Sequence, residues 1–190
     1  PVAMERISAE FMKLVCGEGA VRVLLEYRDV IATFLPQLEP EFDFDQRSPY
    51  HVYDVWEHSV RSCGCIEPDP ALRLAALIHD IGKPSTFTVD ETGRGHFYGH
   101  AEAGAAIAEG VCRTLKLSNV MRKQVVTLVK CHDRTLPMTA KSMRRMIAKL
   151  DEQTCRDLYK LFAADKITHS GLKQVENLQA LEYSKQLFEE

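Results

Sequence analysis

A histidine and an aspartate stand side by side at the end of the most apolar segment of the chain. The pair is His79–Asp80, and it follows Leu72-Arg-Leu-Ala-Ala-Leu-Ile78. A carboxylate is rarely buried unless it is paired or coordinates a metal ion. An imidazole beside it supplies a second ligand type, which Zn, Fe, Mn or Ni accepts. The alternative is a helix end where His79 caps the last carbonyl groups and Asp80 meets solvent, and these residues alone favour neither.

Two later segments also direct a polar side chain toward the core. His132 and Asp165 each continue an apolar stripe at helical spacing, formed by Val125, Leu128 and Val129 and by Leu158, Leu161 and Phe162. A lone histidine on such a face is usually a satisfied core residue, whereas a carboxylate there needs a partner. We therefore predict that both converge with His79–Asp80 on one cation. His58 and His100, which follows Gly99, can complete the set.

The order of these residues resembles the HD superfamily of metal-dependent phosphohydrolases. The segment Leu77-Ile-His-Asp-Ile-Gly-Lys-Pro84 carries the resemblance, with a histidine upstream and an aspartate downstream. The family order of ligands is His, His-Asp and a distant Asp, and members with two metal ions add two histidines. The resemblance thus implies one or two divalent transition metal ions (Fe, Mn, Ni, Co or Zn) on His58, His79, Asp80, His100, His132 and Asp165.

A closer likeness is to the HD region of bacterial CCA-adding tRNA nucleotidyltransferases and poly(A) polymerase-like proteins. It spans roughly residues 5–170 and rests on Glu5-Arg-Ile-Ser-Ala-Glu-Phe-Met-Lys-Leu14, Val55-Trp-Glu-His58, His79-Asp-Ile-Gly-Lys-Pro84, Gly95-His-Phe-Tyr-Gly-His100 and Ala163-Ala-Asp165. Those enzymes also carry a polymerase head with a Gly-rich turn and paired carboxylates. The only Asp-x-Asp here, Asp43-Phe-Asp45, lies in an acidic connector that we interpret as a solvated loop. We expect no nucleotidyltransferase activity from this chain alone, whether it is part of such an enzyme or a free-standing relative.

The resemblance implies hydrolysis of phosphates on nucleotides or RNA ends, of the 2′,3′-cyclic phosphodiesterase, 2′-nucleotidase or phosphatase type. Lys83 is our candidate for contacting a phosphate, although a lysine is also favourable at a helix C-terminus. Asp133 is our candidate for orienting a ligand or protonating a leaving group, although it could equally be a surface residue. His96 and Tyr98 are expected in a hairpin-like loop near the substrate entrance, and His51, His96 and His169 outside the ligand set.

The alternative function is a non-catalytic helical module that docks tRNA or a polymerase domain, with a structural or vestigial metal site. A basic stripe favours it: Lys141, Arg144, Arg145 and Lys149, with Arg122 and Lys123 nearby. An ordinary solvated helix face would have the same composition. The net charge of −3, from 24 basic and 27 acidic residues, disfavours non-specific DNA binding.

The periodicity that positions these residues is helical almost throughout the 190 residues, so we predict an all-α, HD-type helical bundle with at most one small hairpin. An N-terminal helical segment is expected over residues 1–45 and the HD domain with a C-terminal helix over 46–190. Helices are expected near 7–15, 19–35, 53–63, 71–80, 100–115, 118–132, 139–150 and 151–169 and from Leu172, with a connector over 36–50 and a β-like run at 86–89.

Composition adds two expectations. The six cysteines accompany apolar residues in helical patterns, so we predict reduced and mostly buried thiols. No basic leader with an apolar block opens the chain, and its longest apolar stretches are too short for a bilayer, so we predict a cytoplasmic protein without membrane contact. The sequence does not indicate an oligomeric state.

Overall fold

The helix that leads to the His-Asp pair lies at the centre of the molecule. This helix, α5 (Pro70–Leu77), is buried from Ala71 to Leu77 and packs against α1 (Met4–Cys16), α4 (Val55–Gly64), α8 (Asn119–Cys131) and α10 (Glu152–Ile167). Its first turn is fixed by Pro70 and by the side chain of Asp69, which accepts a hydrogen bond of 2.8 Å from the Leu72 amide. Because α5 carries apolar side chains on nearly every face, the other helices enclose it.

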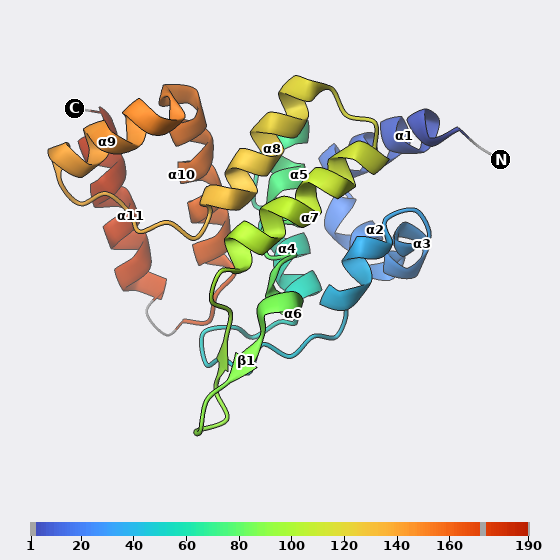
Figure 1. Ribbon diagram of the computed structural model, residues 1–190, viewed down its shortest axis with the longest axis horizontal. Helices are drawn as coiled ribbons and strands as arrows, with labels where there is room; N and C mark the ends of the chain where they lie inside the picture. Colours follow the sequence, from blue (N-terminus) through green and yellow to red (C-terminus); the bar gives the residue numbers. More distant parts are fainter. Residues whose placement is uncertain (1–2, 172–173, 190) are drawn as a thin grey trace.

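The computed structural model describes residues 3–171 and 174–189 and confirms the all-α prediction (Figure 1). The helices α1, α2 (Ala20–Glu26) and α3 (Arg28–Ala32) lie on one side, with the 3-10 helix η1 (Pro36–Glu41) after them. The pair α7 (His100–Thr114) and α8 crosses the middle, and α9 (Ala140–Leu150), α10 and α11 (Gln174–Glu189) form the opposite side.

A small hairpin projects from this bundle. After the short helix α6 (Lys83–Thr86), the strands β1 (Thr88–Val89) and β2 (Gly95–His96) pair antiparallel, with Thr88 opposite His96. The loop between them uses Gly93 at a φ of 85°, a backbone conformation that glycine adopts without strain. The β-like run expected at 86–89 forms a strand only over Thr88–Val89, because Thr86 is the last residue of α6.

The prediction of one helix over residues 19–35 was wrong in two respects, because the segment forms two helices and the second ends at Ala32. Tyr27 leaves helical geometry (φ −114°, ψ 27°) and separates α2 from α3. After this break, Arg28 binds both carboxylate oxygens of Asp43, at 3.0 and 2.7 Å, and lies over the Phe42 ring. These contacts involve residues beyond position 35, so the helical period of residues 19–35 alone could not predict them. The connector expected over 36–50 likewise begins with η1.

The cap of α8, the cysteines and the apolar character of the helices complete the description of the fold. Ser118 caps α8 by accepting a hydrogen bond from the Met121 amide. Within the described residues the six cysteines form no disulfide, and four of them are buried, so the prediction of reduced, mostly buried thiols is confirmed. Leu172, expected to begin the last helix, lies outside the described residues. Among those described, no helix is both long and apolar enough to cross a bilayer.

Candidate metal centre

The His-Asp pair lies in a tight turn directly after α5. The helix ends at Leu77, three residues earlier than the predicted end at Asp80, because Ile78 leaves helical geometry (φ −122°, ψ 14°). The turn is pressed against the start of α7, since a methyl group on Gly82 would collide with the backbone of His100 and Gly104. Asp80 is only 2% exposed, which excludes the interpretation that its carboxylate meets solvent.

One oxygen of Asp80 faces a first group of ligand atoms. Asp80 Oδ2 lies 3.2 Å from Nε2 of His79 and 3.6 Å from Nε2 of His58. Asp165 Oδ1 lies 3.0 Å from the same His58 nitrogen and 3.7 Å from that of His79. Ligand atoms that each lie about 2.0–2.2 Å from a tetrahedral metal ion lie about 3–4 Å from one another. The four distances above fall in this range. The first group therefore has the size of a metal-binding site.

The other oxygen of Asp80 faces a second group. Asp80 Oδ1 lies 3.5 Å from Nε2 of His100 and 3.4 Å from Nε2 of His132, and these two nitrogens are 3.1 Å apart. His132 continues the apolar face of α8, as predicted, while His100 opens α7 after Gly99, whose φ is 78°. Asp80 thus connects two sets of donors through its two oxygens.

Three of the four histidines hold a defined tautomer. His79, His100 and His132 each donate an Nδ1–H hydrogen bond of 2.7–2.8 Å to the carbonyl oxygen of the residue three positions earlier. Because a carbonyl group only accepts, Nδ1 carries a proton in each of these rings, and Nε2 is the nitrogen that faces the site. A fixed Nδ1–H partner is the usual arrangement of metal-ligating histidines.

In a neutral ring with its proton on Nδ1, Nε2 is an acceptor. The Nε2 atoms of His100 and His132 are 3.1 Å apart, and neither carries a proton when both rings are neutral. Among the described residues, Nε2 of His79 is fully buried without a hydrogen-bond partner, while Oδ2 of Asp80 has the Lys83 ammonium at 2.6 Å. Buried acceptors without donors are costly, and a cation between them would satisfy them together. The donor set therefore fits divalent transition metal ions, which accept imidazole and carboxylate ligands.

The electrostatics of the site also favour positive charge. Burial raises the pKa of the Asp80 and Asp165 carboxyl groups, but neighbouring cationic groups, His79 and Lys83 for Asp80 and Lys166 for Asp165, hold both well below the usual range. Burial lowers the pKa of His79, but the Asp80 carboxylate outweighs it and raises the value to about 10. Burial lowers the pKa of His58 to about 4, so this imidazole stays neutral.

The two candidate catalytic residues lie in different surroundings. The Lys83 ammonium is 5% exposed, lies 2.6 Å from Asp80 Oδ2 and donates a hydrogen bond of 2.8 Å to Gln46 Oε1. Lys83 thus neutralises Asp80 as well as lining the cavity. The side chain of Asp133 is 66% exposed, with Oδ2 at 3.9 Å from Nδ1 of His100.

A cavity of about 350 Å³ opens over the two groups. His96 and Tyr98 lie on its wall, as predicted, with their rings stacked at 5.4 Å. The lining residues that were not predicted at the site include His51, Lys166 and His169. His169 follows Asp165 by one helical turn, a spacing that could have revealed it. His51 comes from the connector before α4, which has no period to indicate a direction.

Comparisons with known proteins place these residues in context. A family model described as "HD domain" matches residues 50–169, which contain all six residues of the two groups. The chain is 33% identical over 180 residues to the CC-adding tRNA nucleotidyltransferase of Thermus thermophilus and 34% identical over 177 residues to the A-adding tRNA nucleotidyltransferase of Deinococcus radiodurans. It is 29% identical over 134 residues to a multifunctional CCA protein of Legionella pneumophila.

These alignments cover most of this chain but less than half of each relative. The first two cover 90% and 89% of this chain but 41% and 40% of the relatives. The Legionella alignment covers 67% of this chain and 32% of that protein. The chain therefore spans about two fifths of the length of the first two relatives.

Proposed function

Because this chain belongs to the HD domain family, we propose that it is a metal-dependent phosphohydrolase acting on nucleotides or RNA ends. The observation that carries the proposal is the position of Asp80, whose two oxygens face two separate groups of donors. We assign six residues as ligands of a one- or two-ion centre: His58, His79, Asp80, His100, His132 and Asp165. Fe, Mn, Ni, Co and Zn suit such a set, and the choice among them is open.

A divalent ion at such a centre lowers the pKa of bound water and polarises phosphoryl oxygens. The chain's own residues orient the reacting groups. Lys83 fixes the Asp80 carboxylate through the buried ion pair, and its ammonium borders the cavity where a phosphate would lie. Asp133 lines the same cavity beside His100. We propose that it protonates the leaving group.

The walls of the cavity support a phosphorylated nucleoside as substrate. Lys83, Arg94 and Lys166 bring positive charge to it, which suits an anion. Tyr98 is 79% exposed and parallel to the His96 ring, with an interplanar angle of 5°. A flat exposed ring is a surface on which a base stacks. We therefore propose 2′,3′-cyclic phosphodiesterase, 2′-nucleotidase or phosphatase activity.

The test combines metal content with hydrolysis of a 2′,3′-cyclic nucleotide. Protein purified without chelator should hold one or two ions per chain and turn over the substrate. Asp80→Ala should lose both properties. Asp29→Ala, at a carboxylate whose side chain is 92% exposed, is the matched control and should keep them. Full turnover by a metal-free Asp80→Ala protein would contradict the mechanism.

We also propose that the chain is the HD part of a tRNA nucleotidyltransferase-like protein. The alignment with the Thermus thermophilus relative supports this proposal, because it covers 90% of this chain but only 41% of the relative. Residues 1–45 would form the N-terminal helical segment and 46–190 the HD domain. Asp43 and Asp45 supply no polymerase site in this proposal, and Asp43 pairs with Arg28. We expect no nucleotide addition by the chain alone.

A second candidate function is the non-catalytic docking of RNA, such as tRNA, or of a polymerase domain. It is favoured by exposed cations on α9 that have no ion-pair partner within the described chain: Lys141, Arg144, Arg145 and Lys149. Contact with phosphates would make RNA affinity fall steeply as salt increases. An affinity for tRNA that is independent of salt would argue against this function.

A further inference from the structure

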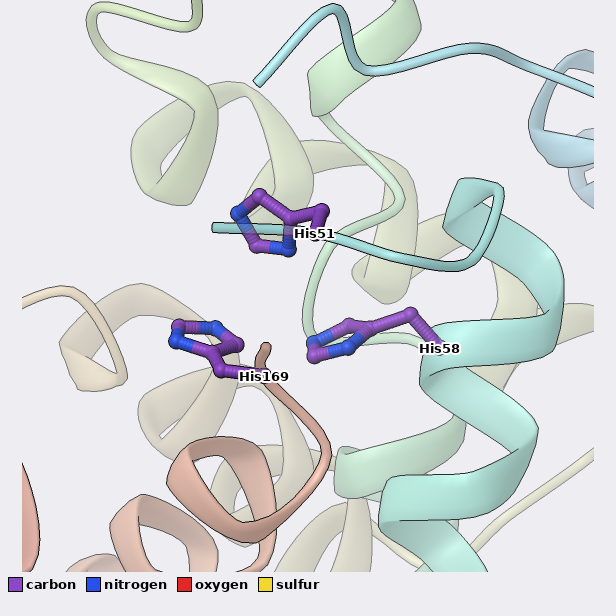
Figure 2. A group of neighbouring side chains, drawn as sticks. All are labelled: His51, His58 and His169. Atoms are coloured by element: carbon purple, nitrogen blue, oxygen red, sulfur yellow. The ribbon is translucent and has the colours of Figure 1, made fainter. Parts of the chain in front are cut away.

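Three histidine rings from three segments face one another at the edge of the centre (Figure 2). His51 comes from the connector before α4, His58 from α4, and His169 from the chain just after α10. The ring centroids of His51 and His169 are 4.6 Å apart, and those of His58 lie 5.3 and 5.4 Å from these two. One nitrogen from each ring lies within 4.8 Å of the other two.

One nitrogen of this cluster has no partner within the described residues, and two others share one. In the described chain, Nδ1 of His51 is fully buried and has no hydrogen-bond partner. Nε2 of His58 and Nε2 of His169 both lie 3.0 Å from one carboxylate oxygen, Oδ1 of Asp165. Two of the three rings therefore converge on a single anionic atom, and the third brings an unpaired buried nitrogen beside them.

We propose that His51, His58 and His169 form a further binding position for a divalent transition metal ion. Three imidazole nitrogens and one open position are a known coordination of zinc. A set composed of imidazoles favours Zn²⁺, Ni²⁺ or Cu²⁺ over Mg²⁺ or Mn²⁺, which prefer oxygen ligands. Tetrahedral zinc ligands lie about 3–4 Å apart, so small rotations of the rings bring the nitrogens to bonding distance.

This position shares a ligand with the centre proposed above. Nδ1 of His58 lies 3.2 Å from the hydroxyl oxygen of Thr168, so Nε2 is the nitrogen available to an ion. The same Nε2 faces Asp165 and Asp80 in the first group. An ion on the three imidazoles draws His58 away from that group, which then keeps His79, Asp80 and Asp165. Excess zinc or nickel should therefore weaken the centre.

The experiment counts zinc ions on the full chain, stripped with chelator and free of a polyhistidine tag, by equilibrium dialysis against ZnCl₂. Asp80 is absent from the three-imidazole position and His51 from the centre, so their variants separate the two. At saturation, His51→Ala should bind one zinc ion fewer than the wild type, and Asp80→Ala should retain the ion that His51→Ala loses. His96→Ala, which removes a histidine of the hairpin, is the matched control and should bind as the wild type does.

The outcomes distinguish this inference from the proposed function. Equal zinc content in His51→Ala and the wild type overturns the further position. Zinc-free Asp80→Ala protein also overturns it, because the imidazoles then hold no ion of their own. A wild type that binds a single ion, lost in His51→Ala and kept in Asp80→Ala, supports the position and removes the phosphohydrolase centre. Circular dichroism checks folding, and His169→Gln supplies a second variant, expected to match His51→Ala.

Discussion

Replacement of Lys83 by methionine tests whether this lysine acts through Asp80 or on a phosphate. The Lys83 ammonium lies 2.6 Å from Asp80 Oδ2 and is 5% exposed, so the pair is withdrawn from water. Methionine keeps an unbranched side chain of similar length but removes the charge. Asp80 then becomes a buried carboxylate without its lysine, and removal of one partner of such a pair costs about 3–5 kcal/mol.

The size of this loss should depend on metal. In the presence of chelator, Lys83→Met should lower the free energy of unfolding by about 3–5 kcal/mol. A divalent ion at 100 times its Kd stabilises a protein by about 2.7 kcal/mol, and by more where the ion binds more tightly. Without the competing ammonium, Asp80 should bind the ion more tightly in the variant. The difference between the variant and the wild type should therefore shrink when metal is supplied.

Urea unfolding followed by circular dichroism, with chelator and with Mn²⁺ or Co²⁺, measures both quantities. Lys13→Met is the matched control, because Lys13 pairs with Glu10 at a side-chain exposure of 72%, and it should cost less than about 1 kcal/mol under both conditions. A Lys83→Met protein that is as stable as the wild type in chelator refutes the reasoning about the pair. A loss that is the same with and without metal refutes the link to the centre. In hydrolysis assays, a raised KM at unchanged kcat indicates phosphate contact, whereas a lowered kcat at unchanged KM indicates action through Asp80.

Three further predictions concern other parts of the chain. Glu41 is fully buried with both carboxylate oxygens unpartnered among the described residues, and burial, with the Asp80 charge, raises its pKa well above 4.5. The folded state therefore keeps a proton that the unfolded state releases, so stability falls as pH rises above about 4.5, by up to about 1.4 kcal/mol per pH unit. Glu41→Gln should flatten this dependence between pH 5 and 8 in urea unfolding, and an unchanged slope would contradict it. Arg73 is 8% exposed and donates hydrogen bonds to carbonyl groups of α1 and of the turn before α5. Arg73→Met should therefore lower the free energy of unfolding by about 3 kcal/mol. A loss below about 0.5 kcal/mol would contradict this role. If α9 docks tRNA, Arg144→Glu with Arg145→Glu should weaken binding and reduce the salt slope by about one per lost phosphate contact, and an unchanged slope would exclude these arginines.

Helical periodicity was sufficient for most of the fold because most helices bury one apolar face. It placed His132 and Asp165 inward, and both are buried. It failed where a local contact redirects the chain. The break at Tyr27 is associated with the pairing of Arg28 with Asp43, fifteen residues away in sequence. A single-segment pattern contains no information about such a partner.

The six proposed ligands could be selected from residue type, burial pattern and family order, and the structure brings them together. The surrounding residues could not. Gln46 contacts Lys83 and His51 contacts the ring of His58, yet both come from a connector whose direction has no periodic signal. His169 was missed for a different reason. Its spacing from Asp165 is that of one helical turn, but it lies beyond the last residue of α10, where a stripe no longer defines a face.

The two interpretations of His79 that the sequence left open are compatible in the structure. The last carbonyl groups of a helix lack partners within the helix, and Nδ1 of His79 donates to one of them, Ala76 O, at 2.7 Å. His132, directly after α8, does the same for Val129 O. Capping by Nδ1 fixes the ring and places Nε2 beside Asp80. Because the last carbonyl groups of a helix need a donor, a histidine at the helix end gains its orientation from the fold itself. The capping role and the proposed ligand role are therefore carried by the two nitrogens of one ring.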